Sequence, residues 1–184
     1  DYYVRDIGIM AGLVKVKGGG ISGAVSTLNL DNAFTDTFDA YMITGVSIGS
    51  DTNSVTLRMR FIKDDGSVDT NTSYATSCIN IADFSTTINR LESNGENQFF
   101  LSRISMGTGT DEYSNIVIYC FNTRLSEHTN YIVENTTLDP NADLKFERGQ
   151  GYHTQNEKIR GLQFFSSSGN LNNGKFTVYG YSKL

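Results

Sequence analysis

The regular alternation of apolar and polar residues along this chain predicts β-strands. The clearest example is the segment 55–61 (VTLRMRF), in which every second residue is apolar and the residues between are threonine or arginine. A period of two is that of a strand with one buried and one solvated face. Similar patterns predict further strands at 13–17, 24–30, 40–46, 98–104, 130–134, 158–165 and 175–181. The segment 115–121 is apolar on both faces, which is typical of a central strand covered on both sides.

Turn-forming residues separate these segments. Gly18–Gly20 ends the first predicted strand, and Asp64–Gly66 predicts a tight turn. Asn173-Gly174 predicts a hairpin between the last two strands, because both residues accept a positive φ. The one candidate helix lies at 83–95, where three apolar residues have helical spacing between a possible N-cap and a glycine. An irregular crossover loop is the alternative for that segment.

Together these patterns predict an all-β protein, an antiparallel, jelly-roll-like β-sandwich of about nine strands with at most one short helix. Antiparallel sheets are favoured because parallel sheets need covering helices. The length of 184 residues suits one domain. We assign residues 12–184 to that domain and residues 1–11 to a connector or N-terminal arm. Long loops are expected at 64–80 and 135–157, and function is expected on them.

Composition and charge exclude some classes of function. The net charge is −5 and no basic stripe is visible, so we expect no binding to nucleic acid. No apolar run approaches the roughly 20 residues that span a bilayer, so we expect no membrane insertion. Two cysteines make no disulfide framework, and Cys120, in the most apolar segment, is expected to be buried and unreactive. The chain begins without methionine or a signal-peptide pattern, which indicates a portion of a longer protein or a processed form.

The sequence contains no motif for catalysis or for a cofactor. His128 and His153 lie in polar segments without a nucleophile elbow, and we interpret them as solvated loop histidines. Glycoside hydrolysis stays open, because the sequence cannot show which of the glutamates Glu127, Glu134, Glu147 and Glu157 lie as a pair. Calcium binding also stays open, since aspartates at 31–39 and 64–71 supply hard oxygen ligands, although the EF-hand order is absent. We expect a protein that is not an enzyme and needs no cofactor or metal.

The tyrosines suggest a binding surface. The chain has 10 Tyr and no Trp in a background rich in Ser, Thr, Asn and Gly. Tyrosine supplies flat apolar area and a hydroxyl group at low entropic cost, and sugar recognition uses the same combination. The alternative is that Tyr and Phe fill the core of the sandwich and contacts between subunits.

The end of the chain resembles a known family. Residues 159–181 (IRGLQFFSSSGNLNNGKFTVYGY) are similar to the closing hairpin of a β-sandwich module in tailed-phage virion proteins, with a serine-rich stretch, Gly-Asn and a final Tyr-Gly. The opening residues 12–14 and the aromatic-Asp-x-Tyr step at 38–41 also resemble that module. The resemblance covers roughly residues 12–181, and residues 1–10 depart from it.

The resemblance implies a virion surface protein that forms homotrimers and contacts other virion proteins. It leaves two roles open: a tail-fibre or appendage tip that contacts host-surface carbohydrate, or a head-decoration (cement) protein that stabilises the capsid shell. A hydrolase on the same sandwich would need two carboxylates facing one groove. For a tip, we expect tyrosines to stack on sugars and polar side chains to form hydrogen bonds. The candidate contact residues are Asp69, Asn71, Tyr74, Tyr152 and His153.

Overall fold

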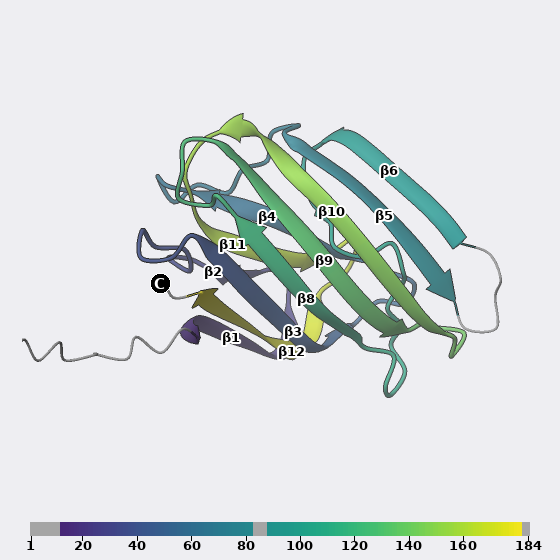
Figure 1. Cartoon of the computed structure of the whole chain (residues 1–184). Coiled ribbons are helices and arrows are strands. Elements are labelled where there is room, and N and C mark those ends of the chain that lie inside the picture. Colours follow the sequence, from purple (N-terminus) through teal and green to yellow (C-terminus); the bar gives the residue numbers. More distant parts are fainter. Residues whose placement is uncertain (1–11, 83–87, 182–184) are drawn as a thin grey trace, which may run out of the picture.

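The computed structural model describes residues 12–82 and 88–181, which form twelve strands in two sheets (Figure 1). The large sheet contains, in spatial order, β1 (Leu13–Val25), β12 (Leu171–Tyr181), β3 (Ala40–Ser50), β8 (Ser114–Phe121), β9 (His128–Leu138), β10 (Leu144–Asn156), β5 (Tyr74–Ala82) and β6 (Ile88–Glu96). The small sheet contains β2 (Leu28–Leu30), β11 (Ile159–Ser166), β4 (Leu57–Lys63) and β7 (Phe99–Phe100).

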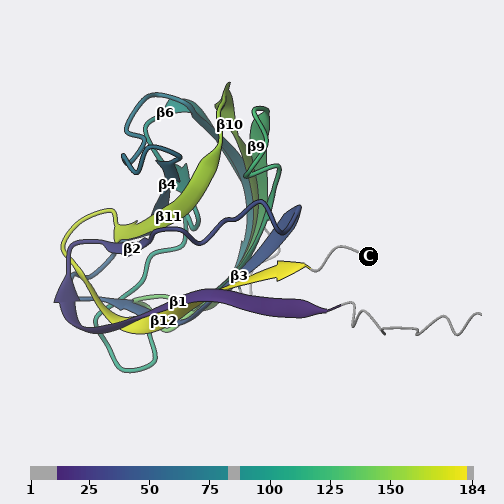
Figure 2. The ribbon, with the colours of Figure 1, turned by 90° about the vertical axis from the view of Figure 1, so that its left-hand side faces the viewer.

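The predicted fold class is confirmed. All pairings between these strands are antiparallel, the two sheets pack together, and the described residues contain no helix. Figure 2 shows the large sheet bending around the small one, from β1 and β12 through β3 to β9 and β10. The small sheet therefore lies inside the curve of the large one, and the outer face of the large sheet has no layer over it among the described residues.

The core lies between the two sheets and is built from alternate residues of each strand. In β4, Leu57, Met59 and Phe61 are fully buried, whereas the two arginines between them face outward. Phe164 of the small sheet stacks on Phe176 of the large sheet, with ring centroids 3.9 Å apart. Each fully buried side chain of this size stabilises the fold by roughly 1.5–3 kcal/mol relative to an exposed one. The alternation predicted for 55–61 is therefore the pattern that holds the two sheets together.

The predicted count of about nine strands was too low. The three strands that the sequence did not reveal, β5, β6 and β10, are neighbours at one end of the large sheet. β5 begins at Tyr74, inside the expected loop 64–80, and β9 and β10 occupy most of the expected loop 135–157. In β10 the inward positions are Glu147, Gly149, Gly151 and His153, so no apolar alternation is present to reveal a strand.

Two further local predictions were wrong. The segment Ile88–Glu96 is β6, paired antiparallel with β5, and not part of a helix; residues 83–87 lie outside the described residues, as do 1–11. Asn173 and Gly174 lie within β12, at irregularities in its pairing with β3, and Gly174 has φ of 121°. β11 and β12 belong to different sheets, so the serine-rich connection crosses between sheets and closes no hairpin.

Close approach of two backbones at Gly161 gives a first testable prediction. A Cβ added there would lie 2.5 Å from the carbonyl oxygen of Leu30, whereas a Cβ added at Gly20 of β1 would meet nothing within 4 Å. Gly161→Ala is expected to lower the free energy of unfolding by about 1–3 kcal/mol, because the strands β2 and β11 must move apart. Gly20→Ala, the matched control, is expected to be neutral or slightly stabilising. Urea unfolding curves of both variants measure this, and equal stability of the two would contradict it.

Candidate functional site

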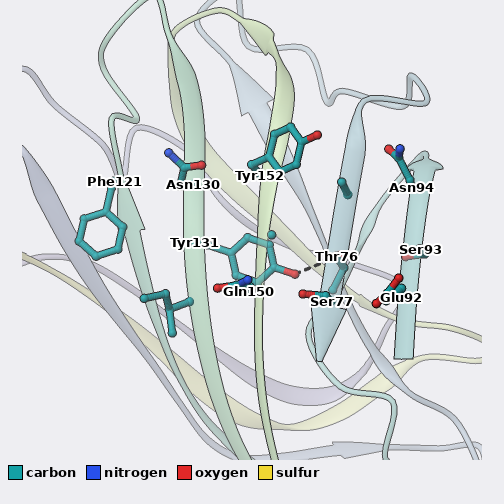
Figure 3. Close-up of a pocket in the computed structure, with 13 residues that line it drawn as sticks. Thr76, Ser77, Glu92, Ser93, Asn94, Phe121, Asn130, Tyr131, Gln150 and Tyr152 are labelled. Carbon is teal, nitrogen blue, oxygen red and sulfur yellow. Dashed lines mark hydrogen bonds between the residues drawn. The ribbon is translucent and has the colours of Figure 1, made fainter. Parts of the chain in front are cut away.

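A groove of about 810 Å³ crosses the outer face of the large sheet (Figure 3). Its lining comes from β5, β6, β8, β9 and β10, and therefore mostly from strands that the sequence did not reveal. The lining residues are Ala75, Thr76, Ser77, Glu92, Ser93, Asn94, Phe121, Asn130, Tyr131, Ile132, Gln150, Gly151 and Tyr152.

The register of the strands brings the outward side chains of the groove into rows. Asn130 of β9 pairs with Phe121 of β8 on one side and with Tyr152 of β10 on the other, and Tyr152 pairs with Ala75 of β5. Residues that lie directly opposite each other on adjacent strands point to the same face of a sheet. A neighbouring row runs from Ile132 across β10 and β5 and ends at Glu92 of β6. These two rows supply most of the groove.

Exposed aromatic rings and amide groups dominate the chemistry of the groove. Tyr152 is 41% exposed and Phe121 is 37% exposed, and Figure 3 shows Asn130 between them. Among the described lining residues, none is lysine or arginine. The single carboxylate of the lining, Glu92, forms an ion pair with Arg90 on the same strand. Flat apolar area with hydrogen-bonding groups beside it, and little charge, suits an uncharged polar ligand.

A buried tyrosine supports the floor of the groove. Tyr131 of β9 is 1% exposed, and its hydroxyl group forms a hydrogen bond with Oγ1 of Thr76 at 3.1 Å. The ring packs against Phe99 of the small sheet, with centroids 4.4 Å apart. It also fills the space over Gly151, where a Cβ would lie 2.3 Å from Cε1 of Tyr131. Burial raises the pKa of Tyr131 well above its ordinary value, so the hydroxyl stays protonated and the floor stays uncharged.

Of the five residues predicted to contact a ligand, Tyr152 lies in this groove. It belongs to strand β10 and not to a loop as expected. The prediction that Tyr74 stacks on a sugar was wrong, because its ring is fully buried and packs edge-on against Phe99 at 4.5 Å. The Tyr74 hydroxyl donates to the carbonyl oxygen of Asp69 at 2.9 Å and accepts from the backbone N–H of Phe61 at 3.1 Å.

The other three predicted residues form a polar cluster with Tyr74 away from the groove. His153 is fully buried, so its interpretation as a solvated loop histidine was wrong, and its Nε2 lies 2.6 Å from Oδ2 of the equally buried Asp69. Asn71 donates from its backbone N–H at 3.0 Å and from Nδ2 at 2.8 Å to Oδ1 of Asp69. Asn71 is exposed, but its backbone N–H and Nδ2 are both engaged with Asp69 in this turn. The cluster therefore anchors the segment before β5 to strand β10.

The same cluster brings together side chains of types that can bind a metal ion. Asp69, His153 and Glu157 each place one ligand atom within 4.8 Å of the others. A histidine that binds a metal donates its second ring N–H to an acceptor, whereas the buried Nδ1 of His153 has no partner among the described residues. A hydrogen bond from Nε2 to Asp69 explains the short contact and leaves Nδ1 unprotonated in the neutral ring. The geometry therefore favours a hydrogen-bonded pair over a metal centre.

Two alternatives from the sequence find no support in the described residues. Three of the aspartates that left calcium binding open are engaged with arginines: Asp31 with Arg160, and both Asp36 and Asp64 with Arg124. Asp65 accepts hydrogen bonds from Ser67, and Asp69 is paired with His153. A hydrolase needs two carboxylates facing one groove, and the described lining of the groove contains only Glu92. Cys120 is fully buried as predicted, and burial raises its pKa far above the ordinary value, so no thiolate nucleophile is available there.

Neither the protein-family models nor the curated protein sequences that were compared with this chain contain a match to it. Within the described ranges, no helix is long and apolar enough to cross a membrane.

The buried Asp69–His153 pair predicts a pH-dependent contribution to stability. Burial acts to raise the pKa of Asp69, but hydrogen bonds from His153 and Asn71 outweigh it and bring the pKa below the ordinary 3.8. A carboxyl group with a lowered pKa in the folded state contributes stability that is complete above about pH 4 and is lost as the pH falls through the folded value. Asp69→Asn is therefore expected to lower the free energy of unfolding by about 1–3 kcal/mol at pH 7.

Below about pH 4 the difference between Asp69→Asn and the unaltered chain is expected to shrink, because Asp69 becomes protonated in both states. Urea unfolding at neutral and acidic pH measures it. The control is Asp111→Asn, at an exposed position, which is expected to change little. A constant difference across this pH range would show that Asp69 does not contribute through its charge.

Proposed function

We propose that this chain is a non-enzymatic surface module of a bacteriophage virion, at a tail-fibre or appendage tip, and that its groove binds host-surface carbohydrate. The observation that carries the proposal is the row Phe121–Asn130–Tyr152, in which an amide lies between two exposed aromatic rings. The resemblance of residues 12–181 to phage virion modules supplies the setting.

The row has the chemistry that sugars require. A sugar ring presents C–H groups on its faces and hydroxyl groups at its rim, so it stacks on an aromatic face while its hydroxyls bind to amides. Gln150, Ser77 and Asn94 supply further polar groups around Tyr152. All of these residues lie on strands of the large sheet, Phe121 on β8 and the others on β5, β6, β9 and β10. The hydrogen-bonded sheet and the buried Tyr131 therefore hold the side chains of the groove in place before a ligand binds.

Removal of the Tyr152 ring tests the proposal. Tyr152→Ala is expected to lower the affinity for a bound glycan by about tenfold, corresponding to the loss of roughly 1.4 kcal/mol of stacking. The measurement is binding of the unaltered and variant proteins to an array of neutral, amino and acidic bacterial-surface glycans, followed by calorimetric titration of each glycan bound.

The matched control is Phe146→Ala. Phe146 lies on the same face of the same strand and is 39% exposed, close to the 41% of Tyr152, but it does not line the groove. Equal loss of binding in both variants would place the glycan elsewhere on the sheet. Absence of binding to every glycan of the array would overturn the proposed function.

A second candidate function, capsid decoration by a homotrimer, is favoured by a different part of the same face. Phe146, Ile81 and Ile88 pair directly across β10, β5 and β6 and are 39%, 39% and 63% exposed. Charged residues border this apolar row, among them Arg148 and Glu134 at 3.5 Å. An apolar centre with a polar rim is typical of protein–protein interfaces, so we propose this row as the contact between subunits or with a virion shell.

Introduction of a charge tests this contact. Ile81→Lys is expected to weaken self-association by about tenfold, because a lysine in the apolar row must lose its hydration on assembly. Val14→Lys is the control, since Val14 lies on β1, at the opposite edge of the large sheet from β6, and is 46% exposed. Sedimentation equilibrium of the unaltered chain and both variants measures the effect. A monomeric unaltered chain at every concentration would contradict self-association through this row.

A further inference from the structure

A second hollow adjoins the groove on the outer face of the large sheet. It measures about 400 Å³ and is lined by Asn122, Glu127, His128, Asn130 and Asn156. Asn130 lines both the hollow and the groove, so the two adjoin at this side chain.

The rings of Tyr152 and His128 meet where the two hollows join. Their centroids are 5.9 Å apart and the planes are inclined by 69°, an edge-on contact. Asn130 donates from Nδ2 to the carbonyl oxygen of His128 at 3.3 Å. His128 and Asn130 therefore separate the groove from the second hollow. If one sugar unit of a ligand stacks on Tyr152, the next unit of the same ligand would enter the second hollow.

An irregularity in β10 shapes the second hollow. Tyr152 pairs with Asn130 and Asn156 pairs with His128, with more residues between the partners on β10 than on β9. Such bulges redirect side chains and are common beside binding sites. Here the bulge carries Asn156 to the position opposite His128, so that both side chains border the same hollow.

The polar groups of the second hollow are oriented for hydrogen bonding. Nδ1 of His128 lies 3.1 Å from the carbonyl oxygen of His153. A carbonyl oxygen only accepts, so Nδ1 must donate, and in the neutral ring Nε2 then carries the lone pair that can accept a ligand hydroxyl. The amides of Asn122, Asn130 and Asn156 each offer donors and an acceptor beside it.

We propose that the groove and the second hollow are consecutive subsites for an oligosaccharide of at least two units that carries no anionic group. This inference rests on the proposed carbohydrate function and names its ligand class. The first subsite stacks a sugar face on Tyr152, and the second binds hydroxyl or amide groups of the next unit through Asn156, His128 and Glu127.

Charge decides against acidic sugars. The lining residues include two carboxylates, Glu92 and Glu127, and the described lining of both hollows has no lysine or arginine. The chain as a whole carries a net charge of −5. Glu92 is already paired with Arg90. An anionic unit in the second hollow, however, would lie beside the Glu127 carboxylate, and the described lining of that hollow supplies no cation to offset the repulsion. A neutral sugar, or one with an amino group, would meet no such repulsion.

The test is a length series of defined oligosaccharides. The probes are β-1,4-linked N-acetylglucosamine and α-1,4-linked glucose, each from the monosaccharide to the hexasaccharide, with α-2,8-linked sialic acid oligomers as the anionic series. Calorimetry gives the affinity of the oligomers, and saturation-transfer NMR that of the monosaccharides. In a series that binds, the affinity of the unaltered chain is expected to rise about tenfold from one unit to three, from the added hydrogen bonds.

Variants of the lining residues show which side chains produce the gain in affinity with oligosaccharide length. Asn156→Ala and Glu127→Gln are expected to lower oligomer affinity several-fold more than monosaccharide affinity, whereas Tyr152→Ala lowers both together. Gln155→Ala is the control, because Gln155 is exposed beside Asn156 and lines neither hollow.

Three results would overturn the inference and leave the proposed function standing. These are an affinity that does not change with length, an equal effect of Asn156→Ala on monosaccharide and oligomer, and binding of the anionic series alone. A binding glycan of another composition found on the array would replace these probes, with the same variants and the same criteria. No binding in any series or on the array would overturn both the inference and the proposed function.

Discussion

The aromatic and aliphatic core between the two sheets decides which way every side chain of the large sheet points. Because the side-chain period of a strand is two, a slip of one residue in β10 would bury Tyr152 and expose His153. Phe61, Phe99 and Tyr131 fill the space between the sheets near that strand. Their packing, together with the Asp69–His153 hydrogen bond, fixes the register on which the groove depends.

The polar cluster inside the sandwich complements this packing. A buried carboxylate and a buried imidazole are costly unless they are hydrogen-bonded, and Asp69 accepts from both His153 and Asn71. The same cluster anchors Tyr74, which begins β5. The position of β5 beside β10, and so the far wall of the groove, is supported by an interaction on the opposite side of the sheet from the groove.

The outer face of the large sheet carries two kinds of surface, the groove and the apolar row, at different positions along its strands. On β10, Tyr152 and Gln150 border the groove, Arg148 lies in a charged row, and Phe146 lies in the apolar row. The proposed sugar site and the proposed contact between subunits therefore involve different residues. A virion tip that binds carbohydrate as an oligomer would use both, and substitutions on this one strand would separate the two proposed functions.

The sequence by itself determined the fold class, because eight of the nine predicted strands alternate between apolar and polar residues, as strands of antiparallel sheets with one buried face do. It also correctly placed Cys120 in the core, and it named Tyr152 as a ligand contact, which the tyrosine content suggested and which stays a proposal. It did not reveal β5, β6 and β10, whose inward positions include Glu147, Gly149, Gly151 and His153. At these positions, residues distant in the chain satisfy the buried polar groups and fill the space that a glycine leaves. Arg103 donates its backbone N–H to Glu147, and Asp69 forms a hydrogen bond with His153. The ring of Tyr131 covers Gly151. Only the tertiary structure could decide which polar residues are buried in the core and which line the groove, because that choice depends on contacts between distant segments and not on local pattern.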